Sequence, residues 1–241
     1  MDLTRTHVLI ADETAMRRLS DRAPRYPADR ERLGRITAPG ARLRFVVGRA
    51  LVARLLDLAG APSGTGVRPD SRGCPRLDPP GGLAVSISHT HGWVAAALTA
   101  GTRCGLDVQE RIDPAWFPAT TLAGVLPTGW AARLTRHHAP ADELTRMWVV
   151  LEAALKWRGT GFSAPVGDLR FATSGAGTAV VDRASGDRTR VDVWTLPGGT
   201  QLAATVGRSG AATVLHTTSG DAVRPVPGPH LTRPLSSSLK G

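Results

Sequence analysis

The chain has 241 residues, 41% of them hydrophobic, and a formal net charge of +10. This length allows one large domain or two small ones with a sizeable core. The positive charge favours anionic partners such as phosphorylated small molecules, acidic proteins or nucleic acid. Two cysteines make no disulfide framework, and no apolar run approaches the roughly 20 residues of a membrane span. Without a visible secretory signal, these features favour a cytoplasmic protein with no membrane partner.

The first part of the chain predicts a strand, a long helix and three further strands. Residues 8–11 are a short apolar run, typical of a buried strand. Apolar residues recur at helical spacing over residues 41–59, between a preceding Pro-Gly and a following Gly, which predicts a helix. The Gly- and Pro-rich residues 60–82 are expected to be loop. Three strands are predicted at residues 84–88, 93–99 and 104–108.

The second part predicts the same order of elements. Residues 109–141 are irregular and interrupted by prolines. An amphipathic helix is expected from Asp142, a suitable N-cap, to Arg158. The Pro- and Ser-rich tail has too little apolar surface to bury and is expected to be disordered. Strands are predicted near residues 168–173, 178–182, 191–196, 201–206 and 212–216.

The repeated order of a long helix and short strands suggests an α+β pseudo-dimer, two similar helix-plus-antiparallel-sheet halves within one chain. We place the halves at residues 1–104 and 105–220, and the disordered tail at 221–241. A ligand cleft between two such halves draws residues from both.

Polar residues interrupt the apolar pattern in three short stretches. The first is the Ser-Ile-Ser-His-Thr run at residues 86–90. Asp107 and Gln109 follow on one face of a strand, and Glu152 and Lys156 lie one helical turn apart. Two carboxylates, a lysine and a Ser-His pair can together bind a hard cation and phosphate oxygens. Lys156 is notable because this chain uses Arg at almost every other basic position.

Each stretch also has a purely structural interpretation. A strand Asp such as Asp107 often caps a turn, and His89 alone is typical of a hydrogen-bonded structural histidine. A Glu–Lys pair at this spacing is usually a solvated helix surface that contributes roughly 0.2–0.5 kcal/mol. Asp12-Glu13 is interpreted as a helix start rather than a metal site, and His137-His138 as loop.

Together, the three stretches resemble a known family. In order and spacing, Ser86-Ile87-Ser88-His89, Gly105-Leu106-Asp107-Val108 and Trp148-x3-Glu152-Ala153-x2-Lys156-x2-Gly159 are similar to the 4'-phosphopantetheinyl transferases. The similarity is to the larger, surfactin-synthetase-activating type, a pseudo-dimer of two α+β halves, and runs over roughly residues 25–215. It implies transfer of the 4'-phosphopantetheine arm of coenzyme A to a serine of an apo acyl or peptidyl carrier protein, with Mg²⁺, releasing 3',5'-ADP.

The resemblance also implies roles for individual residues. Asp107, Gln109 and Glu152 would hold Mg²⁺, for which Mn²⁺ is a possible substitute. Glu152 would accept the serine proton, directly or through a metal-bound water, and Lys156 would contact the pyrophosphate, so that Asp107, Glu152 and Lys156 form the catalytic set. The residues expected to bind coenzyme A are Arg30, Arg32, Arg44, Arg76, Ser88, His89 and Lys156.

The chain departs from the family pattern at three positions of the site. Gln109 and Leu151 stand where members often have Glu and Lys, and Cys74 replaces the lysine of a Gly-Lys-Pro stretch. Arg72 or Arg76 is expected to substitute for that lysine. With a neutral Gln109, the site has two carboxylates completed by phosphate and water, so Mg²⁺ is expected to bind weakly without coenzyme A and firmly with it.

The expected partners are coenzyme A and acidic carrier proteins, whose docking surface is placed in residues 109–141 by analogy with the family. A monomer is expected. Two other functions stay open. One is a non-catalytic relative that binds coenzyme A or a carrier protein as a scaffold. The other is a basic nucleic-acid-binding protein. The lack of a basic helix face with interleaved aromatics in the sequence argues against this function.

Overall fold

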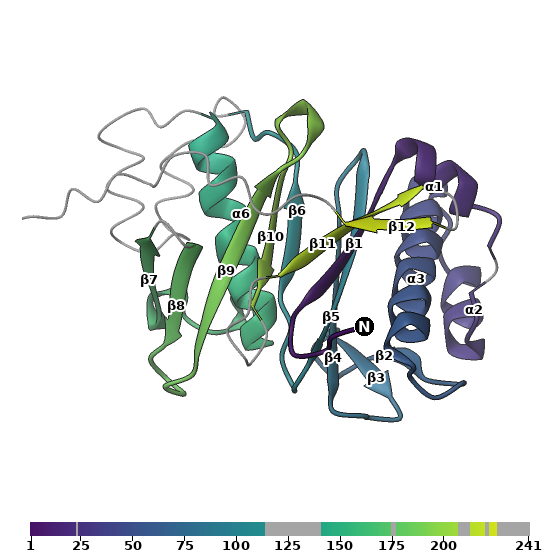
Figure 1. Ribbon diagram of the computed structural model, residues 1–241, viewed down its shortest axis with the longest axis horizontal. Coiled ribbons are helices and arrows are strands. Elements are labelled where there is room, and N and C mark those ends of the chain that lie inside the picture. The colour runs from purple at the N-terminus through teal and green to yellow at the C-terminus, as the bar shows by residue number, and fades with distance from the viewer. Residues whose placement is uncertain (23, 114–140, 175–176, 207–212, 220–221, 226–241) are drawn as a thin grey trace, which may run out of the picture.

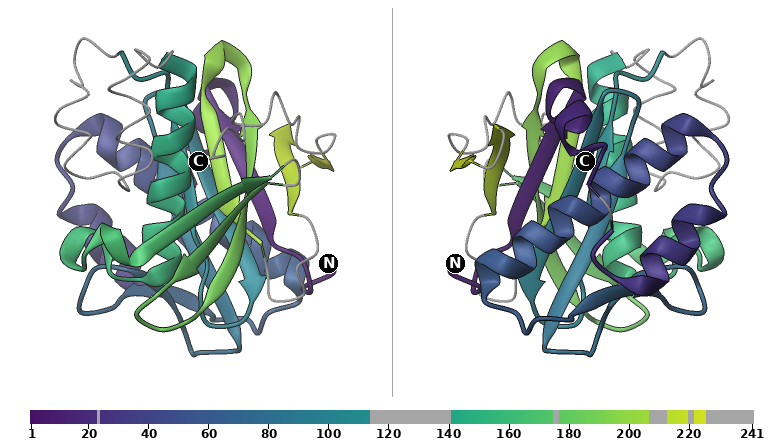
Figure 2. Two further views of the ribbon diagram at one scale, coloured as in Figure 1. Left: turned by 90° about the vertical axis from the view of Figure 1, so that its left-hand side faces the viewer. Right: turned by 90° about the vertical axis from the view of Figure 1, so that its right-hand side faces the viewer.

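Two sheets and two long helices form the body of the molecule, an α+β arrangement (Figure 1). The computed structural model describes residues 1–22, 24–113, 141–174, 177–206, 213–219 and 222–225. The first unit is the sheet β12-β11-β1-β5-β4 with helix α3 (Pro39–Ala59). The second unit is the sheet β6-β10-β9-β8-β7 with helix α6 (Ala141–Arg158). The helices lie on the outer faces of the sheets, so the layers run helix, sheet, sheet, helix (Figure 2).

The first sheet is built around β1 (His7–Asp12). This strand pairs antiparallel with β5 (Trp93–Ala100) on one side and parallel with β11 (Val214–Ser219) on the other. Edge strands on either side complete the sheet, β4 (Leu83–His89) and β12 (Ala222–Pro225).

The second sheet is antiparallel throughout. Its strands, in spatial order, are β6 (Leu106–Gln109), β10 (Gln201–Thr205), β9 (Arg188–Thr195), β8 (Gly177–Asp182) and β7 (Leu169–Ser174). Its edge strand β6 lies beside β4, so the two sheets approach each other at this junction (Figure 1).

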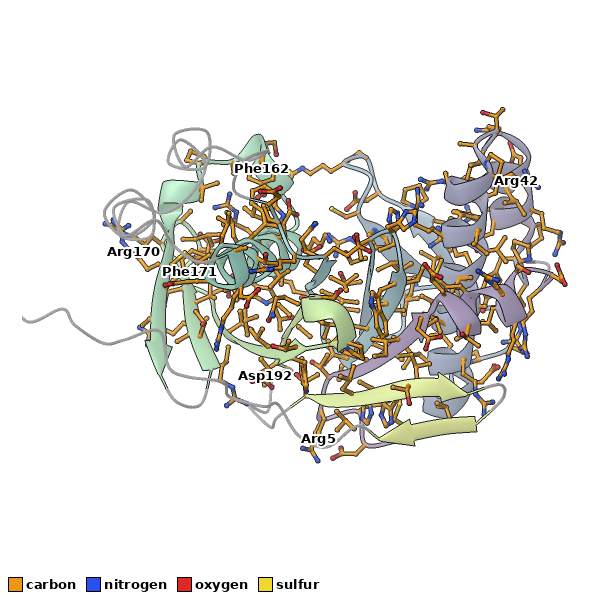
Figure 3. All side chains as sticks on the ribbon, turned by 90° about the horizontal axis from the view of Figure 1, so that it is seen from above. Arg5, Arg42, Phe162, Arg170, Phe171 and Asp192 are labelled. Atoms are coloured by element: carbon orange, nitrogen blue, oxygen red, sulfur yellow. The ribbon has the colours of Figure 1, made fainter. Side chains whose placement is uncertain are left out.

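The core consists of three apolar layers that follow from strand alternation. In β1, Leu9 and Ala11 pack against α3, whereas Val8 and Ile10 face the second sheet. Because both faces of β1 are buried, the strand reads as a continuous apolar run. A third cluster lies between α6 and the second sheet. Figure 3 shows side chains throughout the body of the molecule, from Arg42 on α3 at one end to Phe171 on β7 near the other.

Short elements connect these layers. Helix α1 (Glu13–Leu19) begins where Asp12 accepts a hydrogen bond from the Ala15 amide at 2.8 Å, which confirms Asp12-Glu13 as a helix start. The remaining short helices and turns are α2 (Pro27–Gly34), η1 (Gly161–Ser163), η2 (Val166–Asp168) and η3 (Pro197–Gly199).

Both long helices and the strands named in the sequence analysis are confirmed, but two details are wrong. Residues 60–82 are more than loop, because β2 (Gly66–Pro69) and β3 (Pro75–Asp78) form a hairpin in which Val67 and Leu77 are buried opposite each other. Asp142 is not the N-cap, because α6 begins at Ala141. Its carboxylate instead pairs with Arg111 at 2.9 Å.

The C-terminal part of the chain differs from the expected division at residue 220. Strand β11 pairs with β1, so it belongs to the first sheet rather than to the second half. Residues 222–225 form strand β12, where disorder was expected, because they pair antiparallel with β11. The rest of the predicted tail, 226–241, lies outside the described residues. No helix in the described part of the chain is long and apolar enough to span a bilayer.

Candidate functional site

Two serines connect the sheets where β4 meets β6. The Ser86 hydroxyl accepts a hydrogen bond from the Leu106 amide at 3.1 Å, and the Ser88 hydroxyl accepts one from the Val108 amide at 3.3 Å. These hydroxyls occupy edge amides of β6 that would otherwise need another partner. The two bonds fix the register between the units and bring Ser88 beside Asp107.

Ser88, Asp107 and Lys156 form a hydrogen-bonded cluster across this junction. The Lys156 ammonium lies 2.6 Å from Asp107 Oδ1 and donates to the Ser88 hydroxyl at 3.1 Å. Ser88 donates in turn to Asp107 Oδ1 at 2.7 Å. The Asp107 side chain is only 8% exposed, so it does not cap a surface turn, and its charge is compensated by Lys156 from helix α6 of the same unit.

Glu152 lies on α6 one turn before Lys156 and shares the electrostatic field of the cluster. Burial raises the pKa of Glu152, and the Asp107 charge raises it further, whereas the Lys156 ammonium lowers it. Two carboxylates close enough to repel each other are a suitable environment for a cation. The expected Glu–Lys surface pair is absent from the described ion pairs, because Lys156 pairs with Asp107 instead.

The donor set fits a hard divalent cation in chemistry. Asp107 and Glu152 offer carboxylate oxygens, and alternation along β6 puts the Gln109 amide on the same strand face as Asp107. Within the described ranges, no three His, Cys, Asp or Glu side chains gather into a metal-binding group. A cation here would therefore need oxygen ligands from a substrate or water to complete its shell.

Gly105 determines how closely α6 approaches β6. A Cβ atom at this position would lie 1.9 Å from the Ala153 carbonyl oxygen and 2.8 Å from the Trp157 amide nitrogen. No side chain fits into this space, so the helix backbone lies directly on the strand. This close approach brings Lys156, one residue before Trp157, over Asp107.

A cationic hollow of about 330 Å³ opens beside the cluster in the first unit. Arg32, Arg44, Arg49 and His89 line it, together with Phe45. Two guanidinium groups lie over the Phe45 ring, that of Arg49 at 4.8 Å and that of Arg32 at 5.6 Å from its centroid. We call these five residues the cationic hollow.

The electrostatics of the hollow favour a bound anion. Partial burial, together with the Arg44 and Lys156 charges, lowers the pKa of His89, so its ring is neutral more often than a free histidine. The Arg44 Nε is buried and has no hydrogen-bond partner in the described part of the chain. Phosphate oxygens would satisfy such a donor and reduce the repulsion among the cations.

The structure brings some of the predicted coenzyme A ligands together and separates others. Arg32, Arg44 and His89 lie in the cationic hollow. Arg30 does not, because its guanidinium donates to the Pro24 and Arg25 carbonyls, both at 3.1 Å, and lines a different hollow.

Two further predicted ligands are already engaged in protein contacts. The Ser88 hydroxyl donates once and accepts twice, so its hydrogen-bonding capacity is used within the protein. Arg76 pairs with Asp70 at 3.1 Å and donates to the Thr102 carbonyl at 3.2 Å, away from the cationic hollow.

Sequence reasoning missed Phe45 and Arg49, and it named Ser86 in a motif without giving it a role in the site. Ser86 is two residues before Ser88, so strand alternation puts both hydroxyls on one face. Arg49 was recognisable as a charged residue inside the apolar stripe of α3, and its partner Asp29, at 2.7 Å, is only 2% exposed. A buried ion pair next to a hollow is a signal of function. The sequence shows the charged residue in the apolar stripe but not the partner with which it pairs.

No protein-family model matches the chain, and no curated protein matches its sequence. The predicted docking surface falls mostly on residues 114–140, outside the described residues, as does His137-His138.

Proposed function

We propose that the protein is a magnesium-dependent 4'-phosphopantetheinyl transferase that loads apo acyl or peptidyl carrier proteins from coenzyme A. One observation carries the proposal: Ser88, Asp107 and Lys156 meet within 3.1 Å at the junction of the units, beside Glu152 and the cationic hollow. The three stretches that resemble the family are far apart in sequence. Their convergence is what a shared site requires.

The arrangement of the two units supports the same proposal. Each consists of a long helix on a mostly antiparallel sheet, and the sheets meet edge to edge at β4 and β6. This is compatible with the pseudo-dimer of the family. A site at such a junction can hold a long substrate with one end on each unit.

Coenzyme A fits the distribution of charge around the junction. The cationic hollow, through Arg32, Arg44 and His89, would bind the 3'-phosphate end of the nucleotide, with Arg49 adding a third guanidinium group. The Lys156 ammonium would contact the pyrophosphate. Its contact with Asp107 would then weaken as phosphate oxygens become its partners. The Lys156 side chain is 31% exposed.

Asp107, Glu152 and the Gln109 amide would hold Mg²⁺, or Mn²⁺, together with the pyrophosphate. When bound, the ion would stabilise negative charge that grows on the leaving 3',5'-ADP. Without the ion, the negative charge of Asp107 is neutralised by Lys156. This arrangement agrees with the expectation that the ion binds weakly until the substrate phosphates arrive.

Glu152 is the candidate general base for the carrier serine. Burial and the nearby Asp107 charge raise its pKa, which makes its carboxylate a stronger proton acceptor than an exposed glutamate. The reaction breaks the bond between the leaving 3',5'-ADP oxygen and the β-phosphorus, and forms one from the serine oxygen to that phosphorus. The serine proton passes to Glu152 or to a water that it orients.

The transfer reaction itself tests the proposal. Incubation with coenzyme A, Mg²⁺ and an apo carrier protein should add one phosphopantetheine to the carrier, seen as an increase in intact mass, and release one 3',5'-ADP. Asp107→Asn keeps the shape of the side chain and should abolish the mass increase. Arg188→Gln, on the exposed surface, serves as the matched control and should leave the rate unchanged. Transfer at the wild-type rate by Asp107→Asn would refute the assigned role.

One contact favours a second candidate, a non-catalytic protein that binds coenzyme A. The Lys156 ammonium occupies Asp107 Oδ1, where a metal ligand would be expected to be open. On this interpretation, coenzyme A binds equally well with and without Mg²⁺, and no carrier protein gains mass. Calorimetric titration of coenzyme A in EDTA and in Mg²⁺ separates the two candidates.

A further inference from the structure

A second, larger cavity of about 640 Å³ lies beside the cationic hollow. Gly73, Pro75 and Ile87 line both spaces, so the segment before β3 separates them. The proposed function uses only Lys156 from the lining of this cavity. It leaves most of the walls without a role.

The walls of the cavity are largely apolar. Leu77, Leu83, Val85 and Cys104 contribute to them. Burial raises the pKa of the Cys104 thiol to about 12, so this sulfur is neutral and behaves as a small apolar group. A space of this size with apolar walls suits a hydrocarbon chain better than a polar molecule.

The mouth of the cavity is strongly basic. A polar hollow of about 420 Å³ adjoins it and shares three arginines with it, Arg72, Arg76 and Arg103. Arg76 pairs with Asp70 at 3.1 Å, and Arg103 pairs with Asp187 at 2.7 Å. Arg72 makes no side-chain hydrogen bond or ion pair to any residue that the structure describes. Among the described residues, three guanidinium groups at the mouth are thus balanced by two paired carboxylates, which leaves an excess of positive charge.

Two of these arginines are held in place by contacts that leave donors available. Arg103 lies 5.4 Å from the Trp157 ring centroid, and Arg76 uses Nε and Nη1 for Asp70 and Thr102. Arg158 also borders the polar hollow, but its three nitrogens donate to Thr160, Pro165 and Ala164, so we assign it a structural role. The mouth is therefore arranged for an anion without Arg158.

We propose that this cavity binds an amphipathic anion, an unbranched apolar chain that ends in a carboxylate or phosphate. The head group pairs with Arg72, Arg76 and Arg103, which offer the planar forks that carboxylates and phosphates prefer. The chain lies along Leu77, Leu83 and Val85. The proposal depends on the cavity alone and holds whether or not the protein transfers phosphopantetheine.

A ligand that matches only the apolar walls, or only the arginines at the mouth, leaves the other part of the cavity without a partner. A neutral apolar molecule would fill the walls but would leave the arginines at the mouth without an anion. An inorganic anion would pair with the arginines but leave the apolar walls in contact with water. Only a molecule that carries both features uses the whole space.

Calorimetric titration with four probes tests the proposal. Octanoate and octyl phosphate carry both an eight-carbon chain and an anionic head group, 1-octanol carries the chain alone, and inorganic phosphate the head group alone. Octanoate and octyl phosphate should each bind at least about tenfold more tightly than octanol and inorganic phosphate, since each control lacks one part of the ligand. The ratio of the two anionic affinities then decides which head group the arginines prefer. Equal affinity for octanol, or for inorganic phosphate, would overturn the proposal.

Variants locate the binding in the cavity. Arg72→Gln breaks no described contact, and combined with Arg103→Gln it should weaken octyl phosphate binding at least about tenfold. Arg188→Gln, an exposed arginine on β9, should leave it unchanged. Leu83→Trp narrows the apolar space and should weaken the chain-bearing probes but not inorganic phosphate. Wild-type affinity in the double variant would overturn the proposal, and unaltered thermal unfolding midpoints verify that each variant is folded.

Discussion

The two units of the molecule share a construction but differ in the charge that they present at their junction. Helix α3 of the first unit contributes Arg44 and Arg49 to the cationic hollow. Helix α6 of the second unit contributes Glu152 and Lys156, which face Asp107. The first unit therefore presents mainly positive charge at the junction, whereas the second presents charges of both signs.

Under the proposed function, neither unit holds a complete site. Asp107 belongs to the second sheet, but its hydrogen-bond donor Ser88 comes from the first. The phosphates of a substrate would be held by one unit and its reacting end by the other. The following changes test this division, beginning with the one of largest effect.

Removal of the Lys156 charge tests the second unit most directly. Lys156→Met should lower the rate of carrier loading at least about 100-fold, because a charged contact to developing negative charge is lost. It should also lower the thermal unfolding midpoint, because Asp107 is left buried without its counter-charge. The rate is measured by intact mass of the carrier. Lys156→Arg keeps the charge and should retain more activity than Lys156→Met. Equal loss in both variants would mean that charge is not what matters.

A methyl group at position 105 tests whether close approach of α6 to β6 is needed. Gly105→Ala puts a Cβ atom 1.9 Å from the Ala153 carbonyl oxygen, so α6 must shift, and we expect a loss of about 2–3 kcal/mol in the free energy of unfolding. Urea unfolding measures the loss. Gly167→Ala meets no atom within 4 Å and is the matched control. Similar stabilities for both variants would contradict the role of Gly105.

Loss of one cation tests the first unit. Arg44→Ala should weaken binding of coenzyme A about tenfold, which corresponds to one charge-assisted hydrogen bond. Binding of dephospho-coenzyme A, which lacks the 3'-phosphate, should change much less. Arg30→Ala provides the comparison, because Arg30 bonds to carbonyls outside the hollow. If Arg30→Ala weakened binding as much as Arg44→Ala, the assignment of the nucleotide to the cationic hollow would be wrong.

The smallest expected effect concerns the stacked pair His7 and His216, which connects β1 to β11 in the first unit. The Asp2 carbonyl can only accept, so His7 Nε2 donates to it at 2.6 Å, and His7 Nδ1 accepts from His216 Nε2 at 3.2 Å. Burial lowers the pKa of both rings, with the Asp2 contacts opposing it at His7 and the charge of His7 adding to it at His216.

Because both folded-state pKa values are lowered, the unfolded chain takes up protons first as the pH falls below about 6.5. Stability is therefore fully present above that pH and is lost in acid. His216→Gln should reduce the decline in unfolding free energy between pH 7.5 and pH 5.5, measured by urea titration. His91→Gln, at an exposed position, should leave the decline unchanged. An identical decline in wild type and His216→Gln would exclude the pair as its cause.

The sequence predicted the long helices and most strands because their periodicity follows from burial on one or both faces. It also predicted that Asp107 and Lys156 belong to one site, since the motifs that contain them resemble a family. It could not separate Arg30 from Arg49. Whether an arginine points into a hollow depends on the tertiary packing of α2 and α3, which no local pattern encodes.

Two other features were beyond local reasoning. The pairing of β2 with β3 rests on Val67 and Leu77, too few apolar residues to distinguish a hairpin from loop. The partner of β11 was also undetermined, because an apolar run near residue 214 fits an edge of either sheet. Its pairing with β1 depends on which strand edges remain open once β5 has paired with β1 and β10 has paired with β9.

That pairing has a consequence for the order in which the chain acquires its structure during synthesis. His7 is matched to Val214, so one flank of β1 stays unpaired until the chain has been synthesised as far as β11. Until then β1 has only β5 beside it, whereas β7, β8, β9 and β10 of the second unit are consecutive in sequence and can pair earlier. The unit that is translated first is thus the one completed last.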